Sequence, residues 1–283
     1  MQASAQAGAA SSDRAGGRAA GRESLADATA ADLAAALGQD RGRGTASPRV
    51  DRLQALRYLG YTDQAMNPDL ERRFAQQAQE VESRLQASYC WQLFPLELAL
   101  RYGLPLTLVG EGALEHPGSL IARHLRGAVA VVLAAASLGF DCERRLTQLS
   151  ATSPADQLLY STCASSAVES GLDAARARID ALLEPAGFRT GPPFAPGYGD
   201  LPIAVQPRFL EVLGAQRSIG LSVTAGGVLV PVKSVTACLG VFPCSVRPPD
   251  ERNEALPCDN CTNRNSCKLR AKGLTCYGNG SNS

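Results

Sequence analysis

Residues 219–242, IGLSVTAGGVLVPVKSVTACLGVF, decide the fold class. Apolar and β-branched residues fill three short segments of this stretch, as is typical of strands. The Gly226-Gly227 pair between the first two segments predicts a hairpin turn. Hairpin signals here, after helices and strands that are interleaved irregularly upstream, predict an α+β fold, with a twisted antiparallel β-sheet flanked by helices. The expected strands are 219–224, 228–231 and 234–242.

Further upstream, the spacing of apolar residues predicts helices and strands in irregular alternation. Ser153 followed by Pro154 is typical of a helix N-terminus and begins the longest expected helix. Gly171 weakens this helix by ~1 kcal/mol relative to alanine, so we expect close packing there. The expected helices are 50–59, 68–85, 117–125, 153–183 and 204–214, and the further expected strands are 90–94, 104–109 and 128–136.

The composition suits one soluble globular domain with unstructured ends. The chain has 283 residues, 45% of them hydrophobic, and a net charge of +1. So small a charge attracts no nucleic acid. The first residues, MQASAQAGAASSDRAGG, contain no apolar core of the length that a signal peptide needs, and the longest apolar run, residues 128–138, is too short to span a bilayer. We therefore expect a cytoplasmic protein that partners neither nucleic acid nor a membrane.

Three regions follow from the local composition. Residues 1–46 are rich in Ala, Gly and Arg and have few large apolar side chains, which predicts a disordered tail. Residues 47–247 carry the helix and strand patterns of the α+β domain. Residues 248–283 are polar and rich in cysteine.

A Gly/Pro-rich loop, residues 185–202, contains the sequence APGYGDLP at 195–202. Proline fixes φ, and glycine permits close approaches of the backbone. The loop is therefore expected to be stiff and to bring bare main chain and the Tyr198 ring close to another group. A tyrosine packed locally in a turn is the competing interpretation.

Several segments together resemble the activation domain of cobalamin-dependent methionine synthase, and in particular its short stand-alone relatives. The two most specific are APGYGDLP (195–202) and VPVKSVT (230–236). The others are VDRLQALRYLGY (50–61), SLIARHLRGAVAVVLAAASLG (119–139) and SPADQLLYSTCASSAVESGLDAARARI (153–179). The resemblance spans residues 50–245 and implies the fold of that domain.

The resemblance also implies a role. That domain binds S-adenosylmethionine and supplies it to an oxidised cobalamin on a neighbouring module, while a flavodoxin-like donor provides an electron. The cobalamin signature D-x-H-x-x-G is absent, since Ala122 stands where aspartate is needed, and His124 is interpreted as a helix-face residue. Cobalamin is therefore expected on a partner, a cobalamin-binding or methionine synthase module. Whether the chain is itself an enzyme stays open, and no catalytic residue is assigned.

The residues that the resemblance assigns to the ligand site are Ala195, Gly197, Tyr198, Glu169 and Ser234. A tyrosine face attracts a sulfonium by ~0.5–2 kcal/mol, and a carboxylate such as Glu169 adds Coulomb attraction. A solvated Glu169 is the competing interpretation, as is an ordinary strand bend at Lys233 and Ser234.

One position departs from the motif. The loop motif of the family begins with an arginine that helps to hold the ligand, and here that position is Pro193. Arg189, four residues upstream, replaces it only if the loop folds back. Asp200 is a weaker candidate for a second carboxylate.

The cysteines suggest a second site. Nine of them, an odd number in a reducing compartment, indicate free thiols or metal ligands. A Cys-x2-Cys-x5-Cys-x8-Cys pattern suits zinc or an iron–sulfur cluster, with free thiols as the competing interpretation. Its members are Cys258, Cys261, Cys267 and Cys276; Cys238 and Cys244 are further candidate ligands, and Cys90, Cys142 and Cys163 are expected in the core.

Three functions remain open at this point. The first is an S-adenosylmethionine-binding accessory of cobalamin-dependent methionine synthesis, which supports reductive methylation of a corrinoid on a partner. The second is a docking module for a corrinoid protein that no longer binds S-adenosylmethionine, given Pro193. The third is a redox accessory whose cysteine-rich segment carries the metal.

Overall fold

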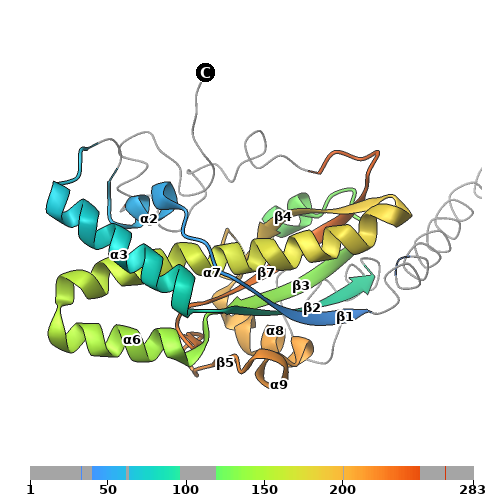
Figure 1. The fold of residues 1–283 in the computed structure, drawn as a ribbon. Helices are drawn as coiled ribbons and strands as arrows, with labels where there is room; N and C mark the ends of the chain where they lie inside the picture. The colour runs from blue at the N-terminus through green and yellow to red at the C-terminus, as the bar shows by residue number, and fades with distance from the viewer. Residues whose placement is uncertain are drawn as a thin grey trace, which may run out of the picture.

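The computed structural model describes residues 33, 40–61, 64–95, 119–199, 201–248 and 265. A five-stranded sheet runs through it in the order β1-β2-β3-β7-β4, and each neighbouring pair is antiparallel (Figure 1). The α+β fold class is therefore confirmed. The strands are β1 (Arg41–Ala46), β2 (Ala87–Pro95), β3 (Ala130–Ser137), β4 (Phe188–Phe194) and β7 (Ser234–Pro243).

A separate hairpin forms where the Gly226-Gly227 pair predicted one. It joins β5 (Ser222–Val223) to β6 (Leu229–Val230), with Gly227 at a φ of 81° in the turn. The expected strand 104–109 lies outside the described residues.

Helices cover both faces of the sheet. Asn67 and Ser153 cap α3 and α7 through side-chain hydrogen bonds, and each cap is followed by proline. Two helices, α6 and α9, were missed by the sequence patterns. The helices are α2 (Arg52–Tyr58), α3 (Pro68–Arg84), α5 (Ser119–His124), α6 (Gly139–Thr152), α7 (Pro154–Leu183), α8 (Gln206–Leu213) and α9 (Ala215–Ile219). None of the described helices is long and apolar enough to cross a membrane.

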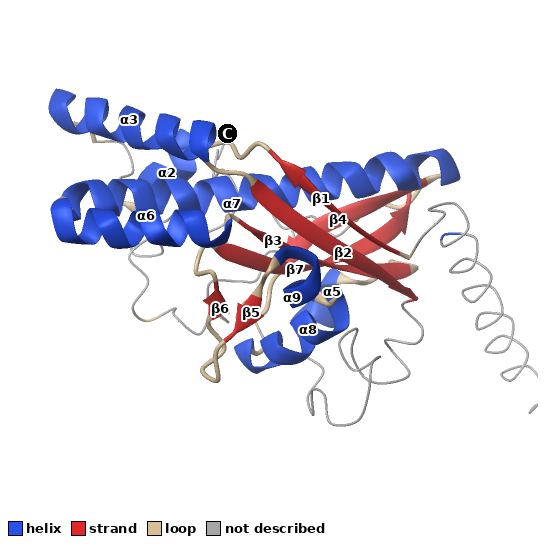
Figure 2. Cartoon of the chain, turned by 60° about the horizontal axis from the view of Figure 1, so that its bottom comes forward, coloured by secondary structure: helices blue, strands red, loops and turns tan. Residues whose placement is uncertain are grey.

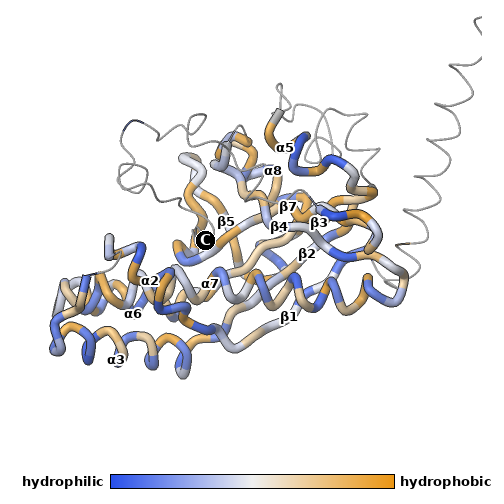
Figure 3. Tube along the Cα trace, turned by 90° about the horizontal axis from the view of Figure 1, so that it is seen from above, coloured by the Kyte–Doolittle hydropathy of each residue, from blue (hydrophilic) through white to orange (hydrophobic). Residues whose placement is uncertain are grey.

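The central strand β3 is buried on both sides, which explains its unbroken apolar sequence. Val132 and Ala134 pack into the core on the α7 side, whereas Val131 and Leu133 pack into the core under α8 and α9. Figures 2 and 3 show these two helical layers on opposite faces of the strands. A strand covered on both faces has no solvent side, so polar residues do not alternate along it.

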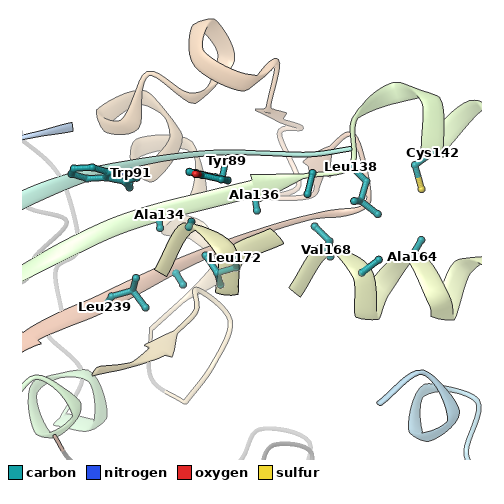
Figure 4. Packing of buried hydrophobic residues seen from close by; sticks show 14 of the residues in the cluster. Tyr89, Trp91, Ala134, Ala136, Leu138, Cys142, Ala164, Val168, Leu172 and Leu239 are labelled. Atoms are coloured by element: carbon teal, nitrogen blue, oxygen red, sulfur yellow. The ribbon is translucent and has the colours of Figure 1, made fainter. Parts of the chain in front are cut away.

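Helix α7 lies unusually close to the sheet. A Cβ at Gly171 would lie 2.7 Å from the Cβ of Ala87 and 3.6 Å from that of Ala136. The close packing expected at Gly171 is confirmed. Figure 4 shows the neighbouring contacts, with Val168 and Leu172 of the helix beside small side chains of the strands.

Strand β1 occupies residues 41–46, which the sequence assigned to a disordered tail. Its RGRGTA sequence contains two glycines and only one residue typical of strands, Thr45. An added Cβ at Gly42 would lie 2.6 Å from the Trp91 ring, and one at Gly44 would lie 2.5 Å from the Tyr89 hydroxyl. The aromatic rings of β2 therefore lie across the glycines of β1, a pairing that stabilises glycine in an edge strand. Leu33 is also buried in this core, so the tail expectation is wrong for these residues.

Strand β4 occupies part of the expected loop 185–202. Its pairing with β7 shifts between Thr190 and Pro193, so the chain bulges at this point. β4 is an edge strand, and edge strands tolerate proline because one side needs no ladder hydrogen bonds. The loop proper therefore begins only at Ala195.

Candidate functional site

The loop that follows β4 closes on itself. The Gly197 amide donates to the Leu201 carbonyl at 2.7 Å, and the Tyr198 amide donates to the Ala195 carbonyl at 3.0 Å. Gly197 has a φ of 93°, which favours glycine, and Pro196 is buried. The Tyr198 side chain is 46% exposed. The loop is therefore closed by its own backbone hydrogen bonds, and part of the Tyr198 side chain faces solvent.

The β5–β6 hairpin braces this loop from behind through Ile203. A Cβ at Gly197 or at Gly227 would lie 3.4 Å from side-chain atoms of Ile203. The hairpin turn and the loop thus both lie beside the Ile203 side chain. Asp200 lies outside the described residues.

Strand register places Ser234 at the same end of the sheet as the loop. Phe194 at the end of β4 pairs with Cys238 of β7, and the strands are antiparallel. The chain therefore leaves β4 toward the beginning of β7, which is Ser234. The Ser234 hydroxyl donates to the Pro231 carbonyl at 2.7 Å and lies 2.8 Å from the Ser137 hydroxyl. Its hydrogen-bonding groups are thus already used within the strand bend.

Lys233, the residue before β7, reaches across to helix α7. Its Nζ donates to the Ser165 hydroxyl at 2.7 Å and to the Ser161 hydroxyl at 2.9 Å. Burial lowers the pKa of Lys233. Within the described part of the chain, no carboxylate lies within 4.0 Å of this ammonium group.

Five residues of α7 form a continuous row, here called the α7 polar stripe, because residues three or four apart share a helix face. One end of the row contacts Lys233. At the other end, the Arg176 guanidinium donates to the Thr190 hydroxyl of β4 at 3.1 Å. Lys233 lies at the end of the sheet where the loop lies, whereas Thr190 lies toward the beginning of β4, so the row runs from the loop end along the sheet. The stripe comprises Ser161, Ser165, Glu169, Asp173 and Arg176.

Glu169 lies in the middle of this stripe and is half-buried, so part of its surface still meets solvent. Burial raises the pKa of Glu169, and the charge of Asp173 raises it further. Burial also raises the pKa of Asp173. Two carboxylates one turn apart, both with raised pKa values, favour a cation between them.

Pro193 faces the same side of the sheet as the stripe. It pairs with Leu239, which packs into the α7-side core, and paired residues of a sheet point to one face. Arg189 does not replace the missing arginine. It lies near the beginning of the extended strand β4 and donates to the Val246 carbonyl at 3.2 Å, away from the loop.

His124 fixes the other side of β4 just before the loop. Its Nε2 donates to the Pro192 carbonyl at 2.9 Å, and its ring centroid lies 5.1 Å from that of Phe194. Burial lowers the pKa of His124. The expectation of a plain helix-face residue thus missed its contact with β4. Sequence reasoning also missed Ser161 and Ser165, although the spacing of four residues from Ser161 to Ser165 and from Ser165 to Glu169 was a usable signal.

No metal site occurs among the residues with described positions, where no group of three or more His, Cys, Asp or Glu side chains could hold an ion. Cys238 is fully buried in the sheet, and burial raises its pKa to about 12, so among the described residues it lies apart from any metal-binding group. The core positions of Cys90, Cys142 and Cys163 are confirmed. The remaining members of the pattern, Cys258, Cys261, Cys267 and Cys276, lie outside the described residues, and their metal site stays a prediction.

Comparisons with known proteins give matches among solved structures alone. No protein-family model matches the sequence, and no curated protein gives a significant match. Among solved structures, the crystal structure of the MetH reactivation domain bound to AdoHcy matches with a TM-score of 0.53 and 14% sequence identity. The match covers 83% of this chain and 86% of that one. The fold of this protein is therefore similar to that of the MetH reactivation domain.

Proposed function

We propose that the protein binds S-adenosylmethionine between the loop at 195–199 and the α7 polar stripe, and thereby supports reductive methylation of a corrinoid held by a partner protein. The proposal is carried by one observation. In a fold similar to that of an AdoHcy-bound protein, the closed loop leaves β4 toward the beginning of β7, and Lys233 at that point contacts α7, the helix that carries two carboxylates with raised pKa values.

The residues present fit the chemistry of this ligand. Its sulfonium and ammonium groups are cations, and Glu169 and Asp173 offer carboxylates on the facing helix. The Tyr198 ring offers a face for the sulfonium. The loop uses the amides of Gly197 and Tyr198 for its own closure, so other main-chain groups read the adenine. The carbonyls of Pro196 and Gly197 suit this role, since they accept no backbone hydrogen bond from the described residues.

The same end of the molecule offers a surface for the partner. Large apolar side chains are exposed on the loop, on the hairpin and between them, and exposed apolar groups around a ligand site are typical of protein contacts. They are Tyr198, Ile203, Val228 and Val232, each about half exposed. A partner that covers them would also exclude water from the methyl group.

Bound S-adenosylmethionine supplies an electrophilic methyl group to a reduced corrinoid. The chain's own part is to hold and orient that ligand beside the partner and to keep water away from it. A flavodoxin-like donor is the proposed source of the electron.

Isothermal titration with S-adenosylmethionine tests the binding step. We expect saturable heat for the wild type, and an affinity about 2-fold to 30-fold weaker for Tyr198→Ala, the equivalent of a lost cation–π contact. Tyr58→Ala on α2 is the matched control, since Tyr58 is exposed to a similar degree. No heat with either S-adenosylmethionine or S-adenosylhomocysteine would contradict the proposal.

The second step needs a corrinoid protein. With a reduced flavodoxin-type donor present, we expect the visible spectrum of the partner's corrinoid to change only when this chain and S-adenosylmethionine are added together. A spectral change of equal rate without the chain would show that it has no part in the reaction.

A docking module without ligand binding is the second candidate, and Pro193 favours it because proline offers no charge to the ligand. Titration of Pro193→Arg separates the two. Heat with the wild type supports ligand binding. Absence of heat with both proteins, combined with a stable complex with a corrinoid protein, supports docking alone.

A further inference from the structure

Lys233 is placed in an unusual electrostatic position at the proposed site. Its ammonium group lies between two neutral hydroxyls and is partly buried, yet no carboxylate of the described residues neutralises it. A half-buried cation that lacks a counter-charge attracts an anion. The two serines orient the amine, and an ammonium group has three hydrogens, so one stays available for a third acceptor.

The Ser161 hydroxyl can donate a further hydrogen bond to a ligand. The Ser165 hydroxyl donates to the Ser161 carbonyl at 3.0 Å, so its proton is used. The Ser161 hydroxyl accepts from Lys233, and no bond that it donates occurs among the described residues. Lys233 and Ser161 together thus present two donors to one anion.

Glu169 lies one helical turn beyond Ser165 on the same stripe, a rise of about 6 Å along the axis. A cation and a carboxylate therefore stand side by side along α7, held apart from each other by the Ser165 turn. An α-amino acid carries the complementary pair, a carboxylate and an ammonium on one carbon.

We propose that Lys233 and Ser161 bind the carboxylate, and Glu169 the ammonium, of the amino-acid end of the ligand. The inference rests on the proposed function and assigns the orientation of the ligand within that site. The amino-acid end lies toward the N-terminal half of α7, and the nucleoside lies toward the loop at 195–199.

Other cations near the site do not serve this role. Arg176 is within 3.9 Å of the Asp180 carboxylate and is bound to Thr190. Arg189 is bound to the Val246 carbonyl. Lys233 is also the one lysine of the chain outside the cysteine-rich segment, since the others are Lys268 and Lys272.

The test compares S-adenosylmethionine with decarboxylated S-adenosylmethionine, which keeps the adenosine, sulfonium and amine but lacks the carboxylate. Affinities of both are measured by titration calorimetry for the wild type, Lys233→Met and Ser161→Ala. Arg178→Met is the matched control, because Arg178 is an exposed cation of α7 about 260° around the helix from Ser161. Circular dichroism verifies that each variant is folded.

For the wild type, we expect about tenfold or more tighter binding of S-adenosylmethionine than of the decarboxylated ligand, as for a charge-assisted hydrogen bond. Lys233→Met should bind the two ligands equally, Ser161→Ala should lose part of the preference, and Arg178→Met should keep it. Because the wild-type comparison needs no variant, an unfolded Lys233→Met leaves the test intact.

Equal affinities of the wild type for both ligands overturn this inference and leave the proposed function standing. A preference that survives in a folded Lys233→Met also overturns it. Binding of neither ligand by the wild type overturns the proposed function, and this inference with it.

Discussion

Gly171 of α7 lies so close to Ala87 of β2 that a Cβ added to the glycine would be only 2.7 Å from the Ala87 Cβ. The helix and the strand therefore approach each other at a point where the helix has no side chain. This contact sets the height of α7 above the sheet. Glu169, two residues earlier in the helix, consequently lies close enough to the sheet to be half-buried at the candidate site. The site thus depends on a glycine that itself contacts no ligand.

Gly171→Ala should destabilise the protein although alanine favours helices. The gain in helix propensity is ~1 kcal/mol, whereas an overpacked core contact costs about 1–3 kcal/mol. We expect a lower free energy of unfolding in urea denaturation, together with weaker ligand binding. Ala177→Leu, at an exposed position of the same helix, should change stability by less than ~0.5 kcal/mol. A more stable Gly171→Ala would show that the helix can move away at little cost.

Gly42→Val should also destabilise, against the strand propensity of valine. The Trp91 ring occupies the space of the added side chain, so ring and strand would separate. A loss of about 1–3 kcal/mol is expected from overpacking. Thr45→Val, on the exposed face of β1, should be tolerated, and equal effects of both changes on the thermal midpoint would refute the packing argument.

Glu169→Gln should stabilise the protein at neutral pH and weaken ligand binding. Burial raises the pKa of Glu169, so its ionised form is disfavoured in the folded state. Stability from such a group is full below its ordinary pKa of about 4.3 and is lost as the pH rises through its folded value. The variant should therefore melt higher at pH 7 and equal the wild type near pH 4. Glu184→Gln, at the exposed end of α7, is the control and should leave the melting temperature unchanged.

Because His124 has a lowered pKa, the protein should become less stable in mild acid. Burial lowers the pKa of His124, so the unfolded chain takes up a proton first as the pH falls. Its contribution is complete above the ordinary pKa of about 6.5 and is lost as the pH falls through the folded value. His124→Gln should flatten this part of the stability profile. The chain has two histidines. The stability of His116→Gln is therefore measured over the same pH range, so that the change can be assigned to one of the two rings.

Thiol titration should separate the core cysteines from the rest. Cys90, Cys142, Cys163 and Cys238 are buried, and burial raises each pKa, so they should react only after unfolding. Cys244 is exposed and should react at once. If the predicted metal site is present, a chelator should release four further thiols together with the metal. Metal analysis on the same anaerobically purified sample checks that expectation.

Much of the framework followed from local patterns. Ser153-Pro154 marked the beginning of α7, and the Gly226-Gly227 pair marked the β5–β6 turn, because caps and tight turns are set by a few adjacent residues. The apolar run of β3 was equally readable. Gly171 announced close packing, although not its partner.

Local patterns failed where distant residues decide. RGRGTA is a strand because two aromatic rings of β2 cover its glycines, and PPF is a strand because β4 lies at an edge. The sequence patterns did not predict α6, because its N-terminal residue is a glycine, which is typical of turns.

The sequence by itself determined that the chain folds around an apolar strand and a long helix, and that a stiff loop carries Tyr198. Those features rest on propensities and turn chemistry within a few residues. Only the tertiary structure decided that Lys233 joins Ser161 and Ser165, some 70 residues away, and that Glu169 becomes half-buried. Burial and counter-charges depend on which elements pack together, and no local pattern contains that information.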